Sequence, residues 1–73
     1  MDDIVDRIIQ YEEGELGVRE SVKLFSDLIK NRIVWQLQGS YGRTADSLIK
    51  SGVINMNGDI DYARLDTLLQ DEE

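Results

Sequence analysis

The stretch RIVWQLQGSYGRTADSLIKS, residues 32–51, decides the fold, because its apolar residues recur every three or four positions. That spacing places them on one stripe of an α-helix. The stripe consists of Val34, Leu37, Tyr41, Ala45 or Thr44, and Leu48. Gly39 and Gly42 interrupt it, and a glycine costs about 1 kcal/mol relative to alanine inside a helix. We predict a continuous or kinked helix over 32–51. The alternatives are a break near Gly39-Ser40 or the close approach of another helix.

The N-terminal residues predict a first helix over about 2–13, in which Asp2 or Asp3 caps the start. Its apolar residues recur four positions apart. They are Ile4, Val5, Ile8 and Ile9. Because these residues are β-branched, a strand is the alternative. Gly14 suits the end of the helix, where a residue of positive φ is common.

A second helix is predicted over about 17–30. Its apolar stripe contains Val18, Ser21, Val22, Phe25, Leu28 and Ile29. Gly17 is an acceptable N-cap, and Glu20 completes half of a capping box. At the other end, Asn31 can adopt the left-handed conformation that terminates many helices.

The C-terminal part predicts a short extended segment near 53–60 with an Asn-Gly turn, then a last helix over about 61–70. Asp59 or Asp61 can cap that helix. Its apolar residues are Tyr62, Leu65, Leu68 and Leu69. The chain is therefore predicted to be one all-α domain over 1–73, a small bundle of three to four helices.

Composition bears on chemistry. The 73 residues include neither cysteine nor histidine, which removes thiol nucleophiles, thiolate metal sites and the commonest general base. Residues 55–62 resemble the middle of a calcium-binding loop, but its first and twelfth positions would be Val53 and Arg64. We expect no catalytic residues, no metal site and no cofactor.

The net charge of −7 is unevenly distributed. Residues 2–15 and residues 59–73 each carry −5, whereas residues 16–58 carry +3. This acidity argues against nucleic-acid binding, whose affinity comes largely from contacts with phosphates. A nucleic-acid-binding regulator that uses Arg32, Arg43 and Lys50 remains an alternative. Carboxylates at the two ends that mimic nucleic acid are a second alternative, and solubility is their plainer interpretation.

The first residues, Met1-Asp2-Asp3-Ile4, are acidic where a signal peptide is positively charged, and no long apolar run follows. We therefore expect a cytoplasmic protein without a membrane segment. A domain this small is near the lower limit for an independent core, so self-association into a homo-oligomer is a further alternative.

The segment Trp35–Ala45 has the pattern W-x-L-Q-G-x-Y-G-R-x-A, and Glu13-Gly14-Glu15-Leu16 forms a turn before it. In these features the chain resembles an uncharacterised family of very small phage and prophage proteins over roughly residues 1–54. The resemblance implies a bacteriophage origin and hence the cytoplasm of an infected or lysogenic bacterial host. It implies no particular activity.

The same segment supplies the candidate binding residues, because Trp, Tyr and Arg are enriched at interface hot spots. They are Trp35, Gln36, Gln38, Tyr41 and Arg43. The alternative interpretation places Trp35 and Tyr41 in the core and Arg43 on a solvated helix face. From these residues we expect a small accessory protein that binds and modulates, by inhibition, a host or phage protein.

Overall fold

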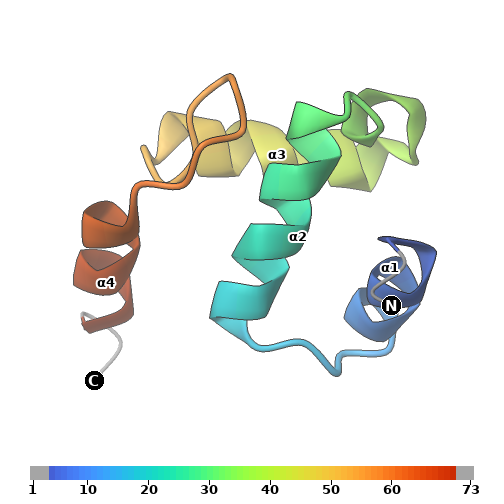
Figure 1. Cartoon of the computed structure of the whole chain (residues 1–73), viewed down its shortest axis with the longest axis horizontal. Coiled ribbons are helices and arrows are strands. Elements are labelled where there is room, and N and C mark those ends of the chain that lie inside the picture. The colour runs from blue at the N-terminus through green and yellow to red at the C-terminus, as the bar shows by residue number, and fades with distance from the viewer. Residues whose placement is uncertain (1–3, 71–73) are drawn as a thin grey trace.

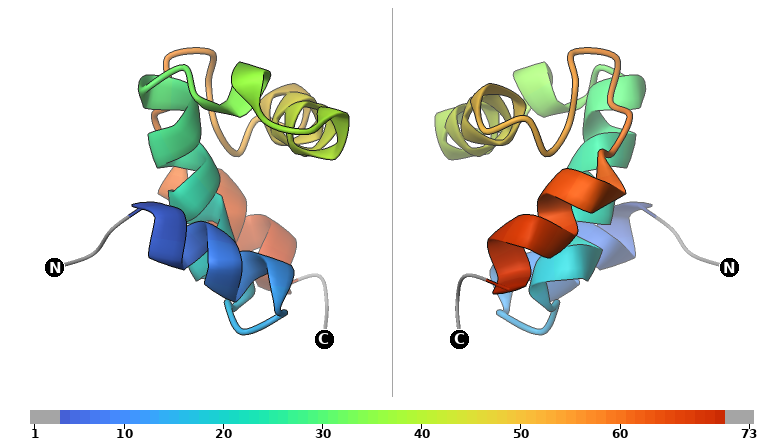
Figure 2. Two further views of the ribbon diagram at one scale, coloured as in Figure 1. Left: turned by 90° about the vertical axis from the view of Figure 1, so that its right-hand side faces the viewer. Right: turned by 90° about the vertical axis from the view of Figure 1, so that its left-hand side faces the viewer.

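The computed structural model describes residues 4–70, which fold into four α-helices and one short 3-10 helix. The elements are α1 (Ile4–Glu12), α2 (Val18–Lys30), the 3-10 helix η1 (Val34–Gln36), α3 (Gly39–Lys50) and α4 (Tyr62–Gln70). Helix α2 stands in the centre, and α3 crosses its C-terminal end (Figure 1). Helices α1 and α4 lie on opposite sides of α2 (Figure 2). The predicted all-α fold is confirmed. Within the described residues, no helix is both long and apolar enough to cross a membrane.

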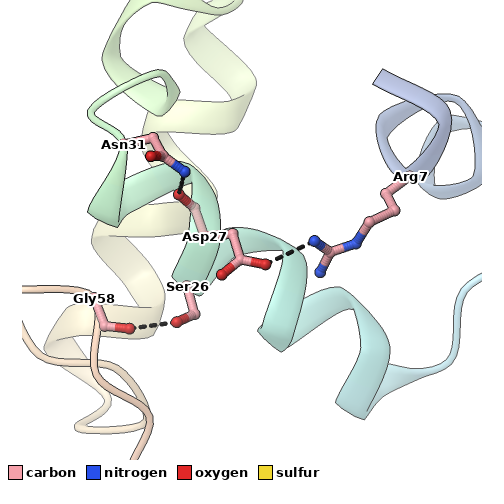
Figure 3. Close-up of polar contacts among 5 residues, drawn as sticks. All are labelled: Arg7, Ser26, Asp27, Asn31 and Gly58. Atoms are coloured by element: carbon pink, nitrogen blue, oxygen red, sulfur yellow. Dashed lines mark hydrogen bonds and ion pairs between the residues drawn. The ribbon is translucent and has the colours of Figure 1, made fainter. Parts of the chain in front are cut away.

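Helix α2 supplies much of the core because it has neighbours on both sides. Leu24, Phe25 and Leu28 are at most 1 % exposed. Leu24 lies outside the predicted apolar stripe, whereas Val18, which is on that stripe, is 52 % exposed. The prediction assumed a helix with one buried face, and a central helix buries more than one. An ion pair of 2.6 Å between Arg7 and Asp27 fastens α1 to α2 (Figure 3).

The single helix predicted over 32–51 is wrong, because the structure divides that stretch into η1 and α3. The break falls at Leu37, whose backbone is extended with ψ of −178°. It is followed by Gln38, the N-cap of α3. The apolar period runs through the break, since Val34, Tyr41 and Ala45 are all buried. Helical spacing therefore identified the buried side chains correctly and missed the interruption.

The ends of the other helices follow the predictions with one exception. The backbone N–H of Gly17 donates to the Glu20 carboxylate over 3.2 Å, as in half of a capping box. Gly14 has the expected positive φ, 76°. Asn31, however, keeps a helical conformation with φ of −91°, and Arg32 adopts the left-handed one with φ of 60°. Helix α2 still ends at Lys30, and only the left-handed residue lies one position later than predicted. The predicted caps Asp2 and Asp3 lie outside the described residues.

Residues 51–61 form a tight hairpin-like connection between α3 and α4. Ile54 and Ile60 form an isolated antiparallel bridge, which confirms the predicted extended segment. The Asn55 side chain accepts hydrogen bonds from the backbone of Asn57 and Asp59, over 2.9 and 3.0 Å. Asp61 accepts one from the backbone of Arg64 over 3.0 Å and so caps the start of α4. Because its turn is hydrogen-bonded internally, this connection is a defined part of the surface.

Gly58 fixes that connection to α2. The Ser26 hydroxyl is buried and donates to the Gly58 carbonyl oxygen (Figure 3). A Cβ atom on Gly58 would lie 2.6 Å from Lys30 Cγ and 2.9 Å from the Ser26 carbonyl oxygen. Gly58 also has φ of 93°, which side chains rarely allow. Only glycine therefore fits this contact without local movement.

Candidate functional site

The connections 31–38 and 51–61 lie on either side of the C-terminal end of α2 (Figure 1). Residues of both connections line a groove. We call it the Trp35 groove; its volume is about 510 Å³. Its lining consists of Ile29, Arg32, Trp35, Asp46, Ile49, Lys50 and Met56. These residues come from α2, η1, α3 and both connections, so only the folded chain brings them together.

Two large apolar side chains of the groove are exposed to solvent. Trp35 is 55 % exposed and Met56 is 82 % exposed. In the same lining, Ile29 is 4 % exposed and Ile49 is half-buried. Exposed apolar side chains that gather beside a buried apolar residue are typical of a binding surface, whereas isolated ones are common on any protein.

The Trp35 ring lies beside Gly42 of α3. A Cβ atom on Gly42 would lie 3.8 Å from Cε3 of the Trp35 ring, which is ordinary van der Waals contact. The ring therefore rests along a glycine-lined part of α3 and still exposes more than half of its surface. Trp and Met offer large contact areas, and Trp is enriched at interface hot spots.

The charges around the groove are mixed. Lys50 forms an ion pair of 2.9 Å with Asp46, one turn earlier on α3. Arg32 is exposed, and its side chain makes no hydrogen bond or ion pair with residues 4–70. The groove thus carries one cation paired within its lining and one cation without a partner among the described residues. On a chain of net charge −7, this is a locally positive position.

The structure separates the five predicted binding residues. Trp35, Gln36, Gln38 and Arg43 are exposed. The Arg43 guanidinium lies over the first turn of α3, where a Cβ atom on Gly39 would be 3.5 Å from it. Of the five, only Trp35 lines the groove. The predicted set therefore contains the groove's aromatic residue together with neighbours on the adjoining surface.

Tyr41 belongs to the core. It is 6 % exposed, and its ring packs with those of Tyr11 and Phe25 at centroid distances of 5.8 and 5.9 Å. Its hydroxyl donates a hydrogen bond of 2.6 Å to the Glu12 carboxylate. Burial, together with this hydrogen bond and the Glu12 charge, raises the pKa of Tyr41 above its ordinary value. Tyr41 supports the segment that presents Trp35 and is not available to a partner.

Met56 was missed by the sequence reasoning. Its signal was an apolar side chain at the tip of a polar Asn-x-Asn-Gly turn, where burial is not expected. Arg32 and Lys50 were considered only as parts of a basic stripe, and the structure places both in the lining of the groove.

A second groove provides a contrast. It has a volume of about 230 Å³ and lies between the end of α1, the start of α2 and α3. Its lining is uncharged and consists of Tyr11, Leu16, Val18, Ser21, Val22, Phe25, Thr44 and Leu48. Since it lacks the combination of charged and exposed apolar side chains, it offers less basis for specific recognition.

The acidic residues of the described segment, 4–70, form no comparable site. Within residues 4–70, no three acidic side chains are grouped so that they could hold a metal ion. Asp27, Asp59 and Asp66 instead form ion pairs with basic residues of other elements.

The chain was also compared with known proteins. None of the curated proteins and none of the solved structures matches it. A family model matches residues 1–70, and the chain belongs to the family described as "Domain of unknown function (DUF7417)".

Proposed function

We propose that the chain is a small phage-type accessory protein that binds a host or phage protein through the Trp35 groove and inhibits it. The observation that carries this proposal is the exposure of Trp35 and Met56, 55 % and 82 %, on a groove that contains the buried Ile29. A partner side chain placed between them would bury apolar surface on three sides, and such burial drives association.

The role is binding rather than catalysis. The chain has no histidine or cysteine, and the groove contains a single carboxylate, Asp46, which is paired with Lys50. The resemblance to small phage proteins supports a bacterial host or the phage itself as the source of the partner, and the host cytoplasm as the place of action. The acid-rich segments at both ends, each of charge −5, would repel acidic competitors and attract a basic partner surface.

The test is affinity capture from a bacterial lysate with three immobilised proteins: the wild type, Trp35→Ala and Tyr62→Ala. Tyr62 is a matched control, because it is 53 % exposed and does not line the Trp35 groove. We expect a partner to be retained by the wild type and Tyr62→Ala and to be lost by Trp35→Ala. Thermal unfolding of each variant checks that the fold is intact.

The proposal also predicts that Trp35→Ala loses the effect of the wild type on growth of the expressing host. Equal capture by all three proteins, or equal growth effects of the wild type and Trp35→Ala, would contradict a role for the groove.

A nucleic-acid-binding regulator is the second candidate, favoured by the position of Arg32 and Lys50 beside an exposed Trp35. Aromatic side chains stack on bases, and flanking cations contact phosphates. Titration with single-stranded and duplex oligonucleotides at low salt tests it, since such binding weakens steeply as salt increases. Self-association is a third candidate, tested by sedimentation over a range of concentrations.

A further inference from the structure

Helices α1, α2 and α3 end in the same backbone motif. After the last turn, one N–H returns to a carbonyl five residues earlier: Glu15 to Gln10, Ile33 to Leu28 and Val53 to Leu48, over 2.9, 3.0 and 3.2 Å. This is the Schellman motif, which requires one residue in the left-handed conformation. Those residues are Gly14, Arg32 and Gly52, with φ of 76°, 60° and 85°.

Arg32 is the exception among the three. Within the described residues it is the only non-glycine residue with positive φ. A side chain in this conformation brings Cβ close to the following carbonyl oxygen, which is why glycine is usual there. The Arg32 side chain makes no hydrogen bond or ion pair with residues 4–70 that would offset the cost. The C-terminal end of α2 favours a positive charge, but Lys30 in its last turn already supplies one. The described part of the fold therefore gives no reason for arginine in a left-handed conformation.

The location of Arg32 supplies the missing reason. It lines the Trp35 groove, where the other cation, Lys50, is already paired with Asp46. A guanidinium forms two parallel hydrogen bonds with a carboxylate, and these are stronger beside a partly dehydrated apolar surface. Strained backbone that nothing in the fold explains occurs preferentially at binding sites.

We propose that Arg32 is the specificity-determining residue of the Trp35 groove and that the groove accepts an amphipathic peptide segment with a carboxylate beside its apolar side chains. The inference rests on the proposed protein-binding function. The apolar surfaces of Trp35 and Met56 take up the apolar side chains, and Arg32 takes up the carboxylate. A nucleic acid is disfavoured as the occupant, because it would bring a row of phosphates to a chain of net charge −7, whereas the peptide segment brings the one carboxylate that Arg32 takes up.

The first experiment measures stability with a reciprocal pair of variants. Arg32→Gly relieves the crowding of Cβ in the left-handed conformation, which stabilises the fold, but glycine also makes the unfolded chain more flexible, which destabilises it. We expect the net effect to raise the unfolding midpoint temperature by about 2–5 °C. Gly14→Arg lowers it by a similar amount, since it places a side chain at φ of 76° where a Cβ atom meets nothing within 4 Å. An unchanged or lowered midpoint for Arg32→Gly would remove the argument that Arg32 is retained for binding.

The second experiment measures binding through the fluorescence of Trp35, the only tryptophan of the chain. The probes are two tryptophan-free amphipathic helical peptides with the same leucine face, one flanked by Glu and the other by Gln. The wild type is expected to bind the Glu peptide about tenfold more tightly, the effect of one charge-assisted pair. Arg32→Gly is expected to bind both peptides equally, and Arg32→Lys to keep part of the preference.

The outcomes separate this inference from the proposed function. If both peptides bind the wild type equally, or if Arg32→Gly keeps the tenfold preference, the proposed role of Arg32 is wrong. The Trp35 groove is then still a peptide-binding site. If neither peptide changes the Trp35 emission, the groove itself fails as a peptide site. Tighter binding of a single-stranded oligonucleotide than of the Glu peptide would overturn the peptide as occupant.

Discussion

The connections 31–38 and 51–61 both follow a Schellman motif, and each brings one exposed apolar side chain to the Trp35 groove. The 51–61 connection has glycine at both positions of positive φ, Gly52 and Gly58, and an asparagine that closes its turn. The 31–38 connection has no glycine and places Arg32 at its position of positive φ. The first connection agrees with local residue preferences and the second departs from them. Such departures are expected where a residue is kept for function.

The largest effect is expected from Gly58→Ala, which tests how the 51–61 connection is held. The added methyl group would meet the Ser26 carbonyl oxygen at 2.9 Å, and φ of 93° disfavours it as well. We expect a loss of about 3 kcal/mol in the free energy of unfolding, measured in urea. Gly14→Ala is the control, because it has a similar φ but open space, and it should cost about 1 kcal/mol. Equal losses for the two variants would show that the close approach to α2 is unimportant.

A smaller effect is expected from Tyr41→Phe, which tests the support of the 31–38 connection. Its hydroxyl links the first turn of α3 to Glu12 of α1. Loss of this hydrogen bond should lower the free energy of unfolding by about 1 kcal/mol at neutral pH.

The same variant has a pH signature. Because the pKa of Tyr41 is raised in the folded state, the folded chain holds this proton more tightly than the unfolded chain does. The associated stability is complete below the ordinary value of 10.0 and is lost as pH rises beyond it. The loss is at most about 1.4 kcal/mol per pH unit, the limit for one proton. Tyr41→Phe should therefore lose less stability above pH 10 than the wild type. Parallel pH profiles would contradict this assignment.

The two connections also show how far sequence predicts the fold. The turn at Gly58 and the end of α1 at Gly14 were predictable, because glycine and asparagine have specific uses in turns and helix ends. The left-handed residue after α2 was placed at Asn31 for the same reason and is Arg32. The apolar spacing continues through the break at Leu37 without proline, and the two glycines placed the alternative break slightly later, near Gly39-Ser40. The conformational preferences of single residues therefore predict the backbone only at positions occupied by a residue that favours the observed conformation.

The candidate site was predictable only in part. The W-x-L-Q-G-x-Y pattern identified Trp35 as a binding residue. It also selected Tyr41, although helical spacing had placed Tyr41, and not Trp35, on the apolar stripe that proved to be buried. Met56 and Ile29 reach the groove from segments distant in sequence. Their proximity depends on tertiary contacts, such as that between Gly58 and α2, and a single sequence does not show these.

The smallest effect on stability is expected from Met56→Ala, which tests whether the 51–61 connection takes part in binding. Met56 is 82 % exposed, so its truncation should change the free energy of unfolding by no more than about 0.5 kcal/mol. The affinity of the Met56→Ala variant for the Glu peptide should nevertheless fall severalfold, because the variant lacks one apolar side chain of the groove lining. Val18→Ala in the second groove is the control and should leave the titration unchanged. An unchanged affinity of Met56→Ala would restrict the binding surface to Trp35 and Arg32. Both residues belong to the 31–38 connection, so the connection that departs from local residue preferences would then form the whole binding site.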